Sequence, residues 1–118
     1  NFTRINESID NIIPTDPISY LEFIYLLKES KGVITDSGGI QEETTVLGIP
    51  CITLRNNTER PETITLGTNE LIGENFEKLQ ESFRKIERSQ CKSGTIPPLW
   101  DGHAATRIVD ILEKMAAE

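Results

Sequence analysis

The chain has 118 residues, a formal net charge of −7, and 26% charged and 36% hydrophobic side chains. This length suits one domain, and the composition is ordinary for a soluble globular protein. The negative charge argues against sequence-independent binding to nucleic acid, which needs clustered lysine and arginine. No apolar run approaches the roughly 18 residues of a membrane span and no signal peptide is present, so we expect a cytoplasmic protein without a membrane partner. The chain begins at Asn1 rather than Met, and we expect it to be a piece of a longer protein.

The two cysteines predict neither a metal site nor a disulfide. Cys51 and Cys91 lie far apart and form no C-x-x-C pattern, which is the spacing that zinc sites and redox centres commonly use. Cys51 lies in an apolar run and is expected to be a small core residue.

Apolar runs alternate with amphipathic stretches along the chain, which predicts strands alternating with helices. The expected strands cover residues 11–14, 33–35, 50–54 and 69–72. The expected helices cover residues 17–30, 39–47, 59–67, 76–86 and 101–115. Strands and helices that alternate at short spacing are typical of right-handed βαβ units, so we predict an α/β fold with a Rossmann-like parallel sheet.

Capping residues and apolar stripes support the expected helices. Asp16 before Pro17 is typical of an N-cap and a first helical position, and Asn75 is a second expected N-cap. The first helix carries an apolar face made of Tyr20, Phe23, Ile24 and Leu27. The fourth carries one made of Phe76, Leu79, Phe83 and Ile86. The last carries one made of Ala105, Ile108, Val109, Leu112 and Met115.

The stretch GVITDSGGIQEE at residues 32–43 indicates an anion-binding turn. A strand that enters a helix through glycines leaves unpaired backbone N–H groups at the helix start, where the helix dipole adds positive charge. Glycines let a phosphate approach the backbone without a Cβ atom in the way. The alternative is an ordinary strand–helix turn in which Ser37, Gly38 and Gly39 only allow the backbone to turn and bind no ligand.

A second polar loop, 55–60, follows the next strand. Because ligands in open α/β sheets bind at the carboxyl ends of the strands, both loops are expected at one rim of the sheet. Two candidate segments at the same rim favour the binding interpretation of the glycine turn.

The assembled motifs resemble the C-terminal part of the non-hydrolysing UDP-N-acetylglucosamine 2-epimerases. The matching text is DSGGIQEE (36–43), LGIP (47–50), LRNNTERPE (54–62), GTNELIG (67–73) and WDGHAATRI (100–108). The resemblance covers essentially the whole chain. It implies part of the C-terminal, UDP-binding domain of a glycosyltransferase-B-like fold, with the N-terminal domain and the first strands of this domain absent.

The resemblance also implies an activity for the parent protein. The family interconverts UDP-GlcNAc and UDP-ManNAc by eliminating UDP to a glycal and adding it back with C2 inverted, which supplies polysaccharide biosynthesis. The parent is expected to be a homodimer without a cofactor. No catalytic residue of the family has a match in this chain, because its acids and bases lie elsewhere, mainly in the N-terminal domain.

By the same resemblance, Ser37, Gly38 and Gly39 contact the diphosphate, and Arg60 lies at the phosphate side. Glu43 binds the ribose hydroxyls, and Phe23 packs near the uracil. These residue types suit those groups, since amides and arginine bind phosphate, carboxylates bind diols, and aromatic rings bind bases.

Each role has a structural alternative. Phe23 lies on an apolar stripe that core packing explains equally well, and Arg60 can pair with Glu42 or Glu62. Gln41 and Glu42 can orient the turn without touching a ligand. We expect His103 to be solvated and Trp100 to pack under the last helix.

The missing strands have a consequence for the sheet. In the doubly wound order they lie between the strand at 11–14 and the strand at 33–35, while the strands near 33, 51 and 70 remain contiguous. We therefore expect an exposed sheet edge, and a chain that is marginally stable or self-associates.

Rival functions remain open at this point. A hydrolysing epimerase or an epimerase of diacetamido-uronic acid sugars has related motifs, and a non-catalytic nucleotide-binding module needs no upstream domain. A generic NAD-binding domain is disfavoured because the chain has no G-x-G-x-x-G pattern.

Overall fold

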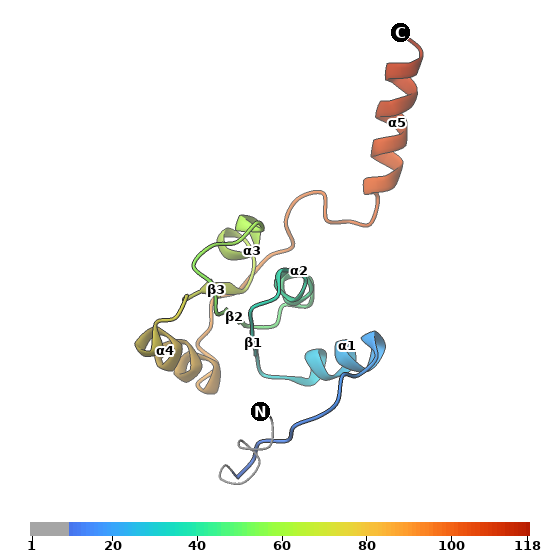
Figure 1. Ribbon diagram of the computed structural model, residues 1–118. Coiled ribbons are helices and arrows are strands. Elements are labelled where there is room, and N and C mark those ends of the chain that lie inside the picture. The colour runs from blue at the N-terminus through green and yellow to red at the C-terminus, as the bar shows by residue number, and fades with distance from the viewer. Residues whose placement is uncertain (1–9) are drawn as a thin grey trace.

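Three parallel strands form one sheet in the centre of the molecule (Figure 1). The computed structural model describes residues 10–118. The strands are β1 (Val33–Thr35), β2 (Cys51–Thr53) and β3 (Asn69–Leu71), in the order β1-β2-β3. Ile34 is aligned with Ile52, and Ile52 with Glu70. The α/β fold class, the parallel pairing and the contiguity of these three strands are confirmed.

Helices cover both faces of the sheet. The helices are α1 (Tyr20–Glu29), α2 (Gly38–Leu47), α3 (Pro61–Thr65), α4 (Phe76–Glu87) and α5 (Ala104–Ala116). Side chains alternate between the two faces of a strand. The face that presents Thr53 and Asn69 is covered by α2 and α3. On the other face, Ser82 of α4 donates a 2.6 Å hydrogen bond to Glu70. The result is a helix–sheet–helix layering of Rossmann type.

The start of α1 differs from the predicted one. Asp16 and Pro17 precede the helix, and Ser19 is its N-cap. The Ser19 hydroxyl accepts from the Glu22 amide, and Glu22 Oε2 accepts from the Ser19 amide at 2.9 Å, which completes a capping box. The helix therefore begins after Ser19 rather than after Asp16, because the two reciprocal hydrogen bonds pair both a helix amide and the amide of the N-cap residue.

The strand expected at residues 11–14 is not formed. This segment begins with a turn at Asp10–Asn11 and continues without regular structure, and Asn11 has a φ of 74°. A strand needs a hydrogen-bonded neighbour. In residues 10–118, the outer edge of β1 pairs with no strand, and Ile34 is 44% exposed there.

The core is small and unusually polar. Its buried hydrophobic side chains are Leu27, Cys51, Ile52 and Ile72. The prediction for Cys51 is confirmed, since it is only 1% exposed. Polar side chains outnumber these four among the buried residues: Thr35, Gln41, Thr44, Thr45, Thr53, Thr63, Thr68, Asn69 and Ser82. Most of them lie between the sheet and the α2–α3 layer, directly behind the expected binding rim.

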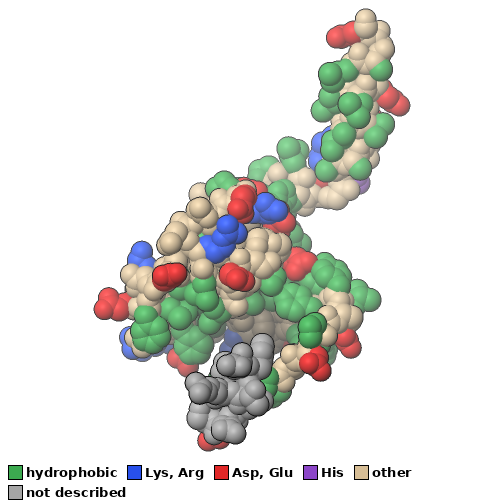
Figure 2. All heavy atoms as spheres, viewed as in Figure 1, with side chains coloured by type: hydrophobic (Ala, Val, Ile, Leu, Met, Phe, Trp, Pro, Cys, Tyr) green, Lys and Arg blue, Asp and Glu red, His purple; other side chains and the backbone are tan. Residues whose placement is uncertain are grey.

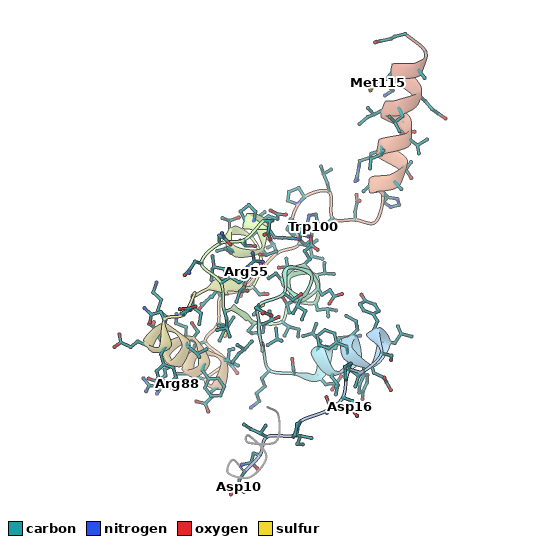
Figure 3. The ribbon with its side chains drawn as sticks, viewed as in Figure 1. Asp10, Asp16, Arg55, Arg88, Trp100 and Met115 are labelled. Carbon is teal, nitrogen blue, oxygen red and sulfur yellow. The ribbon has the colours of Figure 1, made fainter. Side chains whose placement is uncertain are left out.

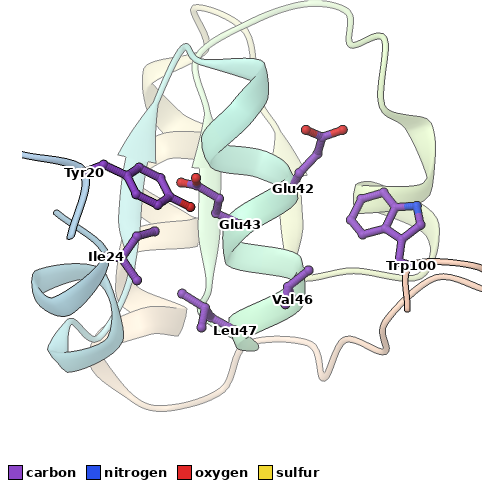
Figure 4. A pocket seen from close by; sticks show the side chains of 7 residues that line it. All are labelled: Tyr20, Ile24, Glu42, Glu43, Val46, Leu47 and Trp100. Atoms are coloured by element: carbon purple, nitrogen blue, oxygen red, sulfur yellow. The ribbon is translucent and has the colours of Figure 1, made fainter. Parts of the chain in front are cut away.

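Helix α5 projects away from the rest of the molecule (Figure 1), which measures 66 × 29 × 25 Å along its principal axes. Its predicted apolar face is present but uncovered, and Figure 2 shows hydrophobic side chains along the helix. Figure 3 shows Trp100 in the segment that leads to α5, and Met115 near the far end of the helix. Trp100 lies beside α2, on the side of Glu42 and Val46 (Figure 4), so its expected place under the last helix is wrong.

Other helix expectations are partly met. The Asn75 side chain caps α4 by accepting from the Lys78 amide at 2.9 Å, as predicted. The apolar stripe of α4 is partly uncovered, because Phe76 and Phe83 are exposed while Leu79 and Ile86 are half-buried. His103 is the exposed N-cap of α5, which confirms a solvated position. Among the residues described, no helix is both long and apolar enough to cross a membrane.

Candidate functional site

Helix α2 begins at the rim formed by the carboxyl ends of the strands. Ser37 is its N-cap, with extended backbone, and the Ser37 amide donates to Thr35 Oγ1 at 3.0 Å. The Ser37 hydroxyl makes no capping bond to the helix. The first-turn amides of α2 therefore lack the partner that an N-cap serine usually supplies. This arrangement leaves N–H donors and a hydroxyl at the positive end of the helix dipole.

Open space lies over the two glycines that start α2. A Cβ atom on Gly38 would meet nothing nearer than Glu59 Oε2 at 3.9 Å, and one on Gly39 nothing nearer than Ser37 Oγ at 3.9 Å. Neither has a backbone conformation that L side chains avoid. By contrast, a Cβ atom on Gly67 would lie 2.4 Å from Thr45 Oγ1. Packing therefore explains the glycine at 67 but not those at 38 and 39, where the free space suits a ligand that approaches the backbone.

The loop after β2 reaches the same rim, as predicted. Thr58 donates from its hydroxyl to Gln41 Oε1 of α2 at 2.7 Å. Arg55, labelled in Figure 3, lies 3.1 Å from Glu59 Oε1 through its Nη2 atom. The pKa of the Glu59 carboxyl lies below its ordinary value, because its own backbone N–H and then Arg55 stabilise the ionised form. The rim therefore combines helix amides with arginine side chains and a carboxylate.

Arg60 pairs with Glu42. The Nε atom of Arg60 lies 2.5 Å from Glu42 Oε1, although this N–H forms no hydrogen bond of acceptable geometry. Both side chains are about one third exposed or more, so the contact is a charge pair of modest strength. One of the two alternative pairings considered for Arg60, that with Glu42, is thus confirmed. The pairing brings a guanidinium to the first turns of α2.

A pocket of about 370 Å³ lies along α2 (Figure 4). Its lining residues are Tyr20, Ile24, Glu42, Glu43, Val46, Leu47 and Trp100. The Tyr20 ring lies beside the Glu43 carboxylate (Figure 4). The Glu43 carboxylate, first as a hydrogen-bond acceptor for the phenol and then as a negative charge, raises the pKa of Tyr20. The pocket therefore joins an acceptor for hydroxyl groups to an apolar wall.

Phe23 does not line this pocket. It is half-buried on α1, on the side of the helix that also buries Leu27. Tyr20 and Trp100 are the aromatic residues that line the pocket, Tyr20 beside Glu43 and Trp100 on the side of Glu42 (Figure 4), and sequence reasoning missed both as pocket residues. Tyr20 lies on the same apolar stripe as Phe23. The stripe predicts that an aromatic residue of this helix packs inward, but it does not indicate which of the two rings faces the pocket.

Sequence reasoning also missed the buried partners of Gln41. Gln41 is fully buried, and its Oε1 atom accepts from Asn69 Nδ2 at 3.1 Å as well as from Thr58. These bonds tie α2 to the loop after β2 and to β3. An asparagine in a short strand expected to be buried was the signal available for the partner of Gln41. Over residues 10–118, no cluster of three or more potential metal ligands occurs.

A parallel sheet with helices on both faces, and a glycine-opened helix at its carboxyl rim, define a Rossmann-like α/β unit of the kind found in glycosyltransferase-B-like folds. The family profile described as UDP-N-acetylglucosamine 2-epimerase matches residues 2–113. The chain belongs to this family.

Individual relatives agree with that assignment. The chain is 46% identical over 97 residues to the UDP-N-acetylglucosamine 2-epimerase of Methanocaldococcus jannaschii, which covers 82% of this chain and 26% of the relative. It also resembles the structure of that organism's epimerase in complex with UDP-GlcNAc and UDP, with a TM-score of 0.72, 44% identity, and coverage of 85% of this chain and 27% of the other.

A further solved relative is the UDP-GlcNAc 2-epimerase of Neisseria meningitidis bound to UDP-GlcNAc. Its TM-score is 0.71 at 34% identity, over 95% of this chain and 32% of the other. The chain spans about 26% to 30% of the length of the curated relatives it matches, corresponding to their C-terminal part.

Proposed function

We propose that this chain is the UDP-binding part of an enzyme that interconverts UDP-GlcNAc and UDP-ManNAc. The observation that carries the proposal is the open pair of glycines at the start of α2, with Arg60 brought to the same rim. Relatives of this chain have been solved in complex with UDP-GlcNAc, one of them also with UDP. An anion cradle made of helix amides and an arginine is suited to a diphosphate.

The proposed role of the cradle is to stabilise a leaving group. In the elimination step, a base takes the proton from C2 of the sugar, and the C1–O bond breaks with its electron pair passing to UDP. Negative charge then grows on the β-phosphate oxygens. The amides of residues 38 and 39, the Ser37 hydroxyl and the dipole of α2 meet this charge, and Arg60 adds a cation. Re-addition of UDP reverses the electron flow and returns the proton to the opposite face of C2.

The nucleoside contacts follow from the pocket along α2. Glu43 accepts hydrogen bonds from the ribose hydroxyls, at the carboxylate that now lies beside the Tyr20 ring (Figure 4). Phe23, which lies outside the pocket one helical turn from Tyr20 on α1, packs near the uracil. The role of Glu43 assigns the ribose to the face of α2 that the pocket opens, and the role of Phe23 rests on the family resemblance alone.

The general acids and bases of the reaction lie outside this chain. His103, the single histidine, is an exposed helix cap remote from α2 in sequence and is not assigned to catalysis. We therefore expect binding of UDP without turnover of UDP-GlcNAc by the 118-residue chain. Detectable turnover by the pure chain would refute this division of labour.

Calorimetric titration of the chain with UDP tests the proposal directly. We expect selective binding of UDP over GDP, weakened at least about tenfold by Glu43→Ala, because one carboxylate acceptor with charged hydrogen bonds is lost. Glu113→Ala, on the projecting α5, is the matched control and leaves the affinity unchanged. No binding by a chain shown to be folded would overturn the proposal for this piece.

Product analysis with the intact parent protein tests the reaction. Formation of UDP-ManNAc from UDP-GlcNAc supports the epimerase. Release of free ManNAc would indicate a hydrolysing enzyme instead, and conversion of only diacetamido-uronic acid sugars would indicate that related class. Binding without any conversion would favour a non-catalytic module.

A further inference from the structure

A cluster of buried polar side chains lies behind the rim, between the sheet and the α2–α3 layer. Its members, here called the polar cluster, are Gln41, Thr53, Thr58, Thr63 and Asn69. All except Thr58 are completely buried, and Thr58 is half-buried where the cluster reaches the loop. These residues come from five separate segments: α2, β2, the loop after β2, α3 and β3.

Asn69 is the centre of the polar cluster. Its Oδ1 atom accepts from Thr53 Oγ1 at 2.5 Å. Its Nδ2 atom donates to Gln41 Oε1 and to Thr63 Oγ1, both at 3.1 Å. One amide side chain on β3 therefore joins β2, α2 and α3 and leaves none of its own polar atoms unpaired.

The cluster ends on the backbone of Arg60. The Arg60 amide donates to Thr58 Oγ1 at 3.0 Å, and the Thr58 hydroxyl donates in turn to Gln41 Oε1 at 2.7 Å. On the other side, the Thr63 hydroxyl donates to the Arg60 carbonyl at 2.7 Å. Both polar groups of the Arg60 backbone are thus held by hydroxyls that are bonded to Gln41 or Asn69.

Stability alone does not account for these side chains. A buried polar network has little advantage over a well-packed apolar core of the same volume, and any unpaired atom in it costs free energy. The Nε2 atom of Gln41 is such an atom, since it is buried without a partner. What the network adds is a fixed geometry, because each hydrogen bond is directional and apolar contacts are not.

We propose that Gln41 and Thr58 are positioning residues that set the place of Arg60 at the diphosphate. The inference rests on the proposed function, in which Arg60 binds phosphate, and adds which residues hold it there. Thr58 forms the link, since its one hydroxyl accepts from Arg60 and donates to Gln41. Because Gln41 is on α2 itself, the same helix that offers its amides to the ligand also sets the position of the arginine.

Substitutions at position 58 in this chain test the proposal. Thr58→Val removes the hydroxyl and keeps the shape, and Thr58→Ser keeps the hydroxyl. We expect Thr58→Val to speed hydrogen exchange of the Arg60 amide and to weaken UDP binding, each by about three- to tenfold, the range for loss of one neutral hydrogen bond. Thr58→Ser restores both. Thr65→Val, which removes an exposed hydroxyl bonded to the Pro61 carbonyl outside the cluster, changes neither.

A double-mutant cycle separates positioning from general damage. If Thr58 acts through Arg60, Thr58→Val has no further effect on UDP affinity in an Arg60→Ala background. An equal loss in both backgrounds, or an unchanged Arg60 amide in Thr58→Val, would overturn the proposal. If the unsubstituted chain binds no UDP, the proposed function fails instead. The exchange rates of Thr58→Val and Thr58→Ser then decide whether the hydroxyl holds the Arg60 backbone.

Discussion

The carboxylate of Glu59 faces Gly38 across the anion cradle, with Oε2 3.9 Å from the position a Cβ atom would take on the glycine. A negative side chain thus stands at the site assigned to a negative ligand. Glu59→Gln is expected to raise the affinity for UDP severalfold at low salt, since it removes this repulsion and frees Arg55 from its ion pair. Titration calorimetry at two salt concentrations measures the gain, which shrinks as salt screens the charges.

Glu62→Gln is the matched control for this charge change, because Glu62 has no side-chain ion pair or hydrogen bond within the described part of the chain. The low pKa of Glu59 adds a pH test. The Glu59 carboxylate is ionised above that pKa. The difference in UDP affinity between Glu59→Gln and the unsubstituted chain is therefore present at neutral pH, and it disappears once acid protonates Glu59. A gain that persists in acid would contradict the electrostatic explanation.

Substitution of a cradle glycine is expected to change UDP affinity without a large change in stability. Gly38→Ala meets no steric obstacle, so thermal unfolding should show a stability change within about 1 kcal/mol. UDP affinity should nevertheless fall about tenfold or more, because the methyl group would occupy the space in which the proposed phosphate accepts amide hydrogen bonds.

Gly67→Ala is expected to behave in the opposite way. Its Cβ atom would collide with Thr45 and with the Thr63 carbonyl, at a cost of about 1–3 kcal/mol in unfolding free energy. The fraction that remains folded should keep its UDP affinity. Equal effects of the two substitutions on stability would argue against an open cradle at Gly38.

The phenol of Tyr20 reports on Glu43. The raised pKa means that the contact favours the protonated phenol, so its stabilising effect is complete below about pH 10 and is lost as pH rises through the higher folded-state pKa. In a Tyr25→Phe background, which leaves one tyrosine, Glu43→Gln should move the phenolate titration back toward the ordinary value. Absorbance titration measures this shift.

The same titration tests the ribose contact. If the ribose hydroxyls take the Glu43 carboxylate, saturating UDP also lowers the pKa of Tyr20, and GDP does not. If the pKa of Tyr20 does not change on addition of UDP while calorimetry shows binding, the nucleotide lies away from Glu43.

Uncovered apolar surfaces predict self-association of the chain. Ile108, Ile111, Leu112 and Met115 of α5 are each more than half exposed. The edge of β1 is unpaired within residues 10–118. Sedimentation equilibrium should show an average mass that rises with concentration, and Leu112→Glu should lower it. Thr106→Glu adds the same charge to α5 outside this stripe and serves as control. A concentration-independent monomer with one sharp unfolding transition would contradict the prediction.

Much of the fold was predictable because its signals are local. The alternation of strands and helices follows from apolar periodicity, and caps at Asn75 and Gly48 lie where short-range chemistry puts them. Gly48 has a φ of 71°, the left-handed conformation that ends helices and that glycine adopts without strain. The meeting of the cradle with the loop at 55–60 follows from parallel pairing, which brings all carboxyl ends to one rim.

The remainder depends on packing that a single sequence does not display. Ser19 and Asp16 are both good N-caps, and only the bonds to Glu22 decide between them. Phe23 and Tyr20 share one stripe, and the docking of α1 decides which ring reaches Glu43. The strand at 11–14 lacked a neighbour, and the polar cluster joins residues that are separated by up to 28 positions.

The two halves of the cradle come from neighbouring strands whose contact is only three residues long. Residues 37–39 follow β1 and Arg60 follows β2, and the strands pair from Val33–Cys51 to Thr35–Thr53. A diphosphate bound by residues 37–39 and by Arg60 would act as a noncovalent cross-link between β1 and β2. By mass action, UDP at about one hundred times its dissociation constant would stabilise the folded chain by about 2.7 kcal/mol. For a unit with so small a core, the substrate would then be a substantial part of what keeps the sheet together.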